Sequence, residues 1–121
     1  MQNIVEELKQ MPFYTYFSQI AAIPRGSGNE RAVSDYVVSF ARKHNLKWRQ
    51  DGHFNVMICK DGSAGYEEKE PIVLQCHMDM VCEKITGSSH DFTRDPILFT
   101  AEDGFLKAGE TSLGADNGVG M

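Results

Sequence analysis

The sequence predicts an α/β domain in which a mixed sheet is covered by helices. Residues 3–44 have apolar side chains at helical spacing, whereas residues 46–108 contain short apolar runs that alternate with period two or are continuously apolar, as in strands. Helices followed by several short strands are typical of a sheet with helices packed on its faces.

The helical part is expected to contain three segments. Residues 3–23 should be helical with a break before Pro12, a residue that suits the first turn of a helix. Pro24 ends this part. The next helix follows Ser27-Gly28-Asn29-Glu30, which has the spacing of a capping box, and its apolar stripe runs from residue 33 to residue 44.

The strands are expected in the second part of the chain. They are a hairpin of residues 46–50 and 54–59 around Asp51-Gly52, an interior strand of residues 72–76 that is apolar on both faces, and a hairpin of residues 97–100 and 105–108. Residues 61–70 should form a solvated loop. Residues 83–95 form a polar loop, and loops of that length inside a compact domain are often functional.

Composition narrows the classes of protein that this chain can represent. A chain of 121 residues is enough for one domain, and 41% hydrophobic with 24% charged residues is typical of a globular protein. A net charge of −5 without a basic cluster argues against nucleic-acid binding, and no apolar run is long enough to span a membrane. The N-terminus does not resemble a signal peptide, so Cys59, Cys76 and Cys82 are expected to be reduced thiols in a cytoplasmic protein.

His77 and Asp79 are the first candidates for a metal site. Alternation along the predicted strand places both on one side, at the carboxyl end, where open α/β sheets form their ligand crevices. Zinc accepts imidazole and carboxylate ligands, and an aspartate near a metal-bound histidine can orient its ring. The alternative is an exposed histidine and aspartate at the start of a loop, and the H-x-D spacing alone does not decide between the two.

Asp116 is the second candidate. Three glycines surround it within residues 113–120, a density that suits backbone held tightly around a ligand, although Asp-Asn-Gly is also favourable turn chemistry. Cys76 should point away from His77 and pack in the interior. His90 is a weaker candidate for substrate contact, and Glu67-Glu68 is interpreted as a solvated pair in a charged loop.

Four sequence blocks occur in a characteristic order. They are IPRGSGNE at residues 23–30, LQCHMDMVCEK at residues 74–84, HDF with DPI at residues 90–97, and LGADNG at residues 113–118. Together they strongly resemble the aminoacyl-histidine dipeptidases, also called cytosolic non-specific dipeptidases. That family belongs to the zinc exopeptidases related to aminoacylases and carboxypeptidase G.

This resemblance implies metal-dependent hydrolysis of dipeptides, either of the Xaa-His type or with broad specificity. It implies that His77 and Asp116 are metal ligands, that Asp116 bridges two Zn²⁺ ions, and that Asp79 is the catalytic aspartate beside His77. Mn²⁺ and Co²⁺ are alternative metals. The implied partners are a small peptide substrate and, for the full-length enzyme, a second copy in a homodimer.

The family pattern extends beyond what this chain contains. A later pair of glutamates, a further acidic ligand, a later histidine and a second domain have no counterpart in residues 1–121. We therefore expect residues 1–121 to be the N-terminal part of a metallopeptidase catalytic domain and the isolated chain to be inactive. The alternatives are a truncated, non-catalytic chain that keeps part of the fold and weak metal binding, and an α/β binding module whose H-x-D motif is accidental.

Overall fold

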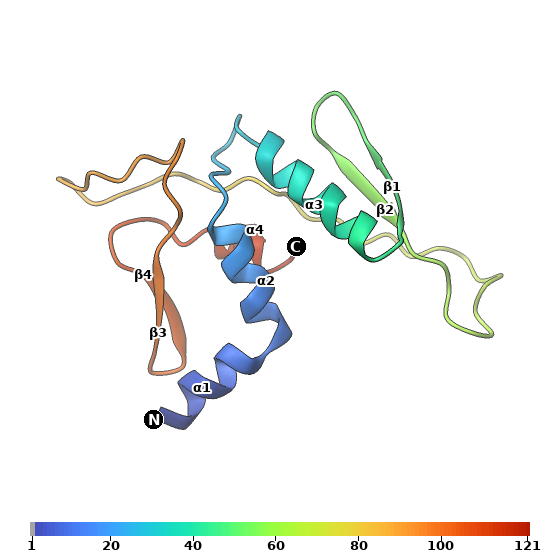
Figure 1. Cartoon of the computed structure of the whole chain (residues 1–121), viewed down its shortest axis with the longest axis horizontal. Helices are drawn as coiled ribbons and strands as arrows, with labels where there is room; N and C mark the ends of the chain where they lie inside the picture. Colours follow the sequence, from blue (N-terminus) through green and yellow to red (C-terminus); the bar gives the residue numbers. More distant parts are fainter. Residues whose placement is uncertain (1) are drawn as a thin grey trace.

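The computed structural model describes residues 2–121, with side chains from Glu6 onward. In this range the elements are, in order, α1 (Gln2–Gln10), α2 (Pro12–Ala21), α3 (Arg31–Lys43), β1 (Lys47–Gln50), β2 (Val56–Cys59), β3 (Phe99–Glu102), β4 (Phe105–Ala108) and α4 (Ala115–Gly118). Figure 1 shows the β1–β2 hairpin beside α3 and the β3–β4 hairpin beside α1, with α2 between them. No helix within residues 2–121 is both long and apolar enough to cross a membrane.

The break between α1 and α2 lies where the sequence predicts it. Met11 has an extended backbone, and Pro12 occupies the first position of α2, where its missing amide hydrogen costs no helical hydrogen bond. The buried face of α2 consists of Phe17, Ile20 and Ala21. This face is the part of α2 that contributes to the core.

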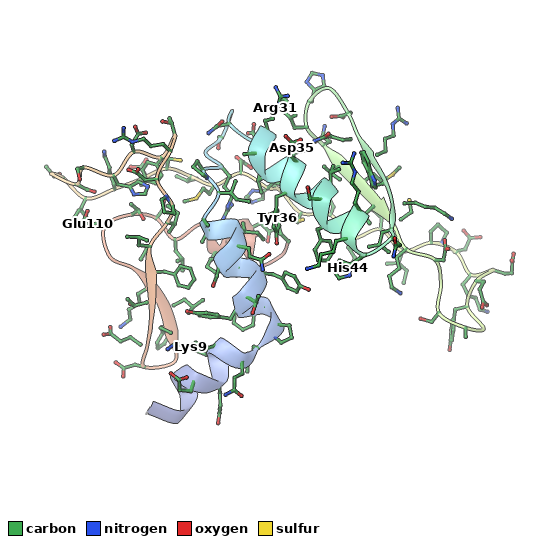
Figure 2. All side chains as sticks on the ribbon, viewed as in Figure 1. Lys9, Arg31, Asp35, Tyr36, His44 and Glu110 are labelled. Carbon is green, nitrogen blue, oxygen red and sulfur yellow. The ribbon has the colours of Figure 1, made fainter. Side chains whose placement is uncertain are left out.

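Helix α3 is also confirmed, but its predicted cap is not. Val33, Val38 and Ala41 are buried, while Arg31 and Asp35 lie on the exposed face (Figure 2). The helix packs against β1 and β2. The capping box is wrong: the cap residue is Glu30, and the cap has no side-chain hydrogen bond. The Ser27 hydroxyl donates instead to a carboxylate 52 residues further along the chain.

Both predicted hairpins form. In the first, Lys47 pairs with Cys59 and Gln50 with Val56, and the Asp51 carboxylate closes the turn by accepting the amides of His53 and Asn55 at 2.9 Å each. In the second, Phe99 pairs with Ala108. Its turn contains Asp103 and Gly104 with positive φ, the conformation that a tight hairpin turn requires.

The predicted interior strand at residues 72–76 is wrong. This segment forms no ladder with any strand in residues 2–121, and Ile72, Val73 and Leu74 are 88%, 85% and 92% exposed. Within residues 2–121, β1 pairs only with β2 and β3 only with β4. Residues 72–76 therefore have no neighbouring strand in this range to pair with, although their composition suits a strand. The predicted combination of helices and strands is present, with the strands arranged as two antiparallel hairpins.

The chain becomes anchored immediately after this exposed segment. The Met80 amide donates to the Arg25 carbonyl at 3.0 Å, and Gly26 and Met80 form a parallel bridge. Met80 is 3% exposed and packs in a core cluster with Ala21 and Ile97. Further along, the Ser112 amide donates to the Glu83 carbonyl at 2.8 Å. Residues 80–83 are therefore held between a loop that follows α2 and a loop that precedes α4.

We predict that Phe17→Ala strongly destabilises the fold. Phe17 is 2% exposed, its ring lies 5.4 Å from the ring of Phe99, and it borders Gly118 of α4, so its removal leaves a cavity where three elements meet. Loss of a buried phenylalanine costs about 3–5 kcal/mol. Urea denaturation measures the free energy of unfolding. Phe105→Ala, at a residue that is 66% exposed, is the control and should cost less than about 0.5 kcal/mol. Equal losses in the two variants would contradict the core described here.

Candidate metal centre

The side chains of His77 and Asp116 meet although the residues are 39 positions apart. Nε2 of His77 lies 3.0 Å from Oδ1 of Asp116. This distance confirms the predicted approach of the two residues. The prediction that His77 stands at the carboxyl end of a strand is wrong, because it follows the unpaired segment. Asp116 lies in α4, where its backbone is not helical.

Asp79 occupies the other side of the His77 ring. Nδ1 of His77 lies 3.0 Å from Oδ1 of Asp79 and 3.0 Å from the Asp79 carbonyl oxygen. A backbone carbonyl can only accept a hydrogen bond, so Nδ1 carries a hydrogen and donates it. The Ser27 hydroxyl donates to Oδ2 of Asp79 at 2.5 Å. Ser27, Asp79, His77 and Asp116 thus form one continuous hydrogen-bonded chain.

The hydrogen bonds among these four side chains shift the pKa values of His77 and Asp79. The pKa of His77 is raised, chiefly by the hydrogen bond to Asp116 and further by Asp79, against a smaller opposing effect of burial. The pKa of Asp79 is lowered, chiefly by the Ser27 hydroxyl, with a smaller contribution from His77. Both ring nitrogens of His77 face acceptors, which favours the doubly protonated imidazolium. The resulting stabilisation is complete below about pH 6.5, the ordinary pKa of histidine, and is lost as the pH rises through the raised value.

The contact between His77 and Asp116 suits a shared metal ion. With Nδ1 protonated, the neutral ring presents the Nε2 lone pair to Asp116, and imidazole nitrogen and carboxylate oxygen are both zinc ligands. Two ligand atoms that each lie about 2.0–2.1 Å from a tetrahedral zinc are roughly 3.3 Å apart. The observed 3.0 Å is close to that spacing. A cation between these atoms would take the place of the Nε2 proton.

The site is partial within the described chain. Residues 2–121 contain no group of three or more histidine, cysteine, aspartate or glutamate side chains placed to hold one metal ion. The site is also open to solvent, since the side chains of His77 and Asp116 are 47% and 96% exposed. The donors therefore fit part of a zinc site.

Two further residues near this site were not among the candidates predicted from the sequence. Ser27 matches a helix cap by spacing, but its hydroxyl binds Asp79. Arg25 is 1% exposed, which is unusual for arginine, and it donates to the carbonyls of Met78 and Gly114. The partners of both residues are more than fifty positions away in the chain, so neighbouring residues could not reveal them.

The other candidates from the sequence have no described hydrogen bond to Ser27, Asp79, His77 or Asp116. Cys76 is half-buried. The His90 ring packs edge-to-face on Phe92, with 4.5 Å between the ring centroids, and its buried Nε2 has no hydrogen-bond partner in the part of the chain that the structure describes. Glu67 and Glu68 are exposed, as predicted.

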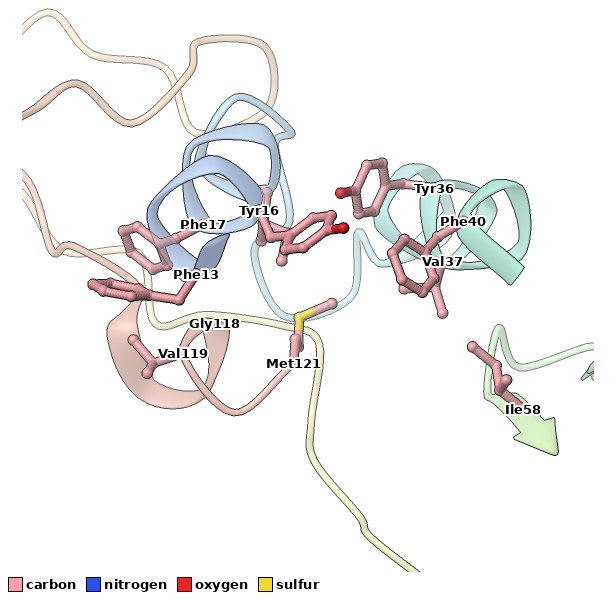
Figure 3. A pocket seen from close by; sticks show the side chains of 11 residues that line it. Phe13, Tyr16, Phe17, Tyr36, Val37, Phe40, Ile58, Gly118, Val119 and Met121 are labelled. Carbon is pink, nitrogen blue, oxygen red and sulfur yellow. The ribbon is translucent and has the colours of Figure 1, made fainter. Parts of the chain in front are cut away.

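A separate cavity of about 350 Å³ lies between α2, α3 and the residues after Asp116. Its lining is largely apolar and includes Phe17, Phe40 and Val119 (Figure 3). None of the three predicted site residues lines it.

The chain is similar to known proteins in both structure and sequence. The structure is a partial α/β domain that matches the crystal structure of an aminoacylhistidine dipeptidase from Vibrio alginolyticus over 99% of this chain, with a TM-score of 0.88 and 37% identity. The sequence is 38% identical over 117 residues, or 97% of this chain, to the cytosol non-specific dipeptidase of Escherichia coli strain K12. No family model matches the sequence.

These similarities confirm the resemblance to aminoacyl-histidine dipeptidases that the four sequence blocks predict. They extend over nearly the whole of this chain. The chain spans about a quarter of the length of each relative, 24% of the Escherichia coli protein and 25% of the Vibrio alginolyticus chain.

We predict that Asp116→Asn lowers the pKa of His77 in the metal-free protein. The variant replaces the carboxylate that contributes most to the raised value, while the contacts of Nδ1 with Asp79 remain. An NMR titration of the imidazole measures the pKa directly. Asp91→Asn, in the polar loop, is a matched control that should leave the His77 titration unchanged. An unaltered His77 titration in Asp116→Asn would show that the contact is absent in solution.

Proposed function

We propose that this chain is the N-terminal part of the catalytic domain of a zinc-dependent dipeptidase. The observation that carries the proposal is the 3.0 Å contact between His77 Nε2 and Asp116 Oδ1, two potential ligands brought together from distant parts of the sequence. Two relatives that are both named dipeptidases support it. Peptide hydrolysis is therefore the activity that we assign to the protein to which these residues contribute.

Each side chain has a distinct proposed role. His77 and Asp116 would hold the metal, and the resemblance to the dipeptidases implies that Asp116 bridges to a second ion. Only its Oδ1 is engaged in the described contacts, so Oδ2 is available for that ion. Zinc, when bound, would polarise the scissile carbonyl and lower the pKa of a bound water. Asp79 would orient the His77 ring through Nδ1, and Ser27 would hold the Asp79 carboxylate in place.

The substrate and setting are part of the same proposal. The relatives are named for non-specific and for aminoacylhistidine dipeptidase activity, which favours dipeptides of broad or Xaa-His type. Mn²⁺ or Co²⁺ are the alternative metals, since imidazole and carboxylate ligands also suit them. We further propose a cytoplasmic location, in line with the cytosolic relative. The resemblance to the dipeptidase family also implies a homodimer for the full-length enzyme.

We predict that His77→Ala removes zinc binding and dipeptide hydrolysis together, whereas Asp79→Asn separates them. In the native protein, meaning the full product of its gene, Asp79→Asn should lower turnover by about 10–100-fold and keep most of the zinc, because Asp79 orients a ligand. The assays are dipeptide hydrolysis and zinc content after dialysis. His44→Ala, at the exposed end of α3, is the control histidine variant. Loss of most zinc in Asp79→Asn would make Asp79 a direct ligand, and turnover that persists with a chelator would overturn the proposal.

We predict that residues 1–121 alone have no appreciable dipeptidase activity. A catalytic zinc usually has three protein ligands and a water, whereas this chain brings together His77 and Asp116 with Asp79 behind the ring. A general base typically contributes about 10²–10⁴-fold, and no glutamate is among the described contacts of the site. The measurement is hydrolysis by the purified 1–121 chain with added zinc or manganese. Chelator-sensitive turnover that His77→Ala abolishes would show that this chain supplies a complete active site.

A further inference from the structure

We propose that Arg25 is a positioning residue that fixes the separation of His77 and Asp116. It does so by bridging the two backbone segments that carry them. The inference rests on the proposed metal site and adds a residue that the similarity to dipeptidases does not assign.

Arg25 donates hydrogen bonds to both of these backbone segments. Nη1 donates to the Met78 carbonyl at 3.0 Å and to the Asp79 carbonyl at 3.3 Å, while Nη2 donates to the Gly114 carbonyl at 2.6 Å. One acceptor directly follows His77, and another lies two residues before Asp116. The guanidinium is planar and rigid, so donors on both of its terminal nitrogens hold the two segments at a set distance.

The guanidinium of Arg25 is packed closely against the backbone on either side of Asp116. A Cβ atom added at Gly114 would lie 2.6 Å from Nη2 of Arg25, and one added at Gly118 would lie 2.7 Å from it. Any side chain at either position would collide with Arg25. Two of the glycines around Asp116 therefore allow its backbone to approach the buried arginine.

Burial of the Arg25 charge is energetically unfavourable. A buried charge is unfavourable unless it is paired and hydrogen-bonded. Arg25 is 1% exposed, and its Nε has no hydrogen-bond partner among the described residues. Burial lowers the pKa of Arg25, and the nearby Asp79 carboxylate opposes that shift. A well-packed apolar side chain often gives equal or greater stability than a buried charge. A role in geometry explains why a rigid, multiply bonded cation occupies this position.

Arg25 and the His77 ring also share a hydrogen-bond acceptor. The Asp79 carbonyl accepts from Nη1 of Arg25 and from Nδ1 of His77, at 3.3 and 3.0 Å. A shift of this carbonyl would turn the imidazole relative to Asp116. Misplacement of a reacting or binding group by about 1 Å can cost on the order of 10²-fold in rate.

The test compares Arg25→Lys and Arg25→Met with the unmodified native protein. Lysine keeps the charge, but its single nitrogen cannot reproduce the fork, and methionine fills the space without a donor. The readouts are the zinc dissociation constant from chelator competition, the absorption spectrum of the Co²⁺-loaded protein, and kcat and KM, each on samples whose folding is verified by circular dichroism. Arg42→Lys is the control, because Arg42 is an exposed residue of α3 that stacks 4.8 Å over Trp48.

We expect both Arg25 variants to weaken zinc binding by about tenfold or more, to alter the Co²⁺ spectrum, and to lower kcat more than they change KM. Arg42→Lys should match the unmodified protein. A purely structural role would lower thermal stability but leave the zinc affinity and Co²⁺ spectrum of the folded protein unchanged, and that result would overturn the inference.

Gly118→Ala keeps Arg25 and moves it by inserting a methyl group against Nη2. It should weaken zinc binding in the same direction, and it decides the question if the Arg25 variants do not fold. Unchanged zinc affinity in Gly118→Ala would then overturn the inference. Zinc binding by the unmodified protein that does not depend on His77 would overturn the proposed function as well, whereas His77-dependent binding with unaffected Arg25 variants would overturn the inference alone.

Discussion

The pairing of residues 25–27 with residues 78–80 is the constraint on which the candidate site depends. It consists of the hydrogen bond from the Met80 amide to the Arg25 carbonyl, the β-bridge between Gly26 and Met80, and the hydrogen bond from the Ser27 hydroxyl to the Asp79 carboxylate. Residues 72–74, which precede this pairing in the chain, are exposed. The pairing therefore gives a defined position to His77 and Asp79, which directly follow a segment that has no ladder partner within residues 2–121.

The same constraint extends to the chemistry of the site. Asp79 is held by Ser27 and in turn fixes the hydrogen on Nδ1 of His77, so Nε2 is the nitrogen that faces Asp116. In the metal-free protein a proton joins His77 to Asp116, which raises the pKa of the imidazole. A metal ion at the proposed site would compete with this proton for the same lone pair. The hydrogen-bonded chain occupies Nδ1 and thus leaves Nε2 as the nitrogen that could coordinate a metal.

Local sequence patterns predicted the elements whose structure depends on neighbouring residues. Helical periodicity placed α3, the missing amide hydrogen of Pro12 placed the break before α2, and turn chemistry at Asp51 placed the first hairpin. The H-x-D spacing and the glycines around Asp116 identified residues that meet in space. Their roles as metal ligands remain proposals.

The predictions that were wrong or missing concern residues whose structure depends on partners far away in the sequence. An apolar run at residues 72–76 predicts a strand, but hydrophobicity does not specify a neighbour with which to pair. Ser27 has the spacing of a cap, yet a carboxylate 52 residues away competes for its hydroxyl. The contacts of Arg25 could not be predicted, because its acceptors are backbone carbonyls, which no residue type marks in a sequence.

Anomalous diffraction at the zinc edge, from crystals of the native protein grown with zinc, tests the central claim most directly. The account predicts a zinc peak about 2.0–2.2 Å from both His77 Nε2 and Asp116 Oδ1, with Nδ1 still directed at Asp79. A zinc ion bound elsewhere, with Nε2 of His77 still hydrogen-bonded to Asp116, would contradict it.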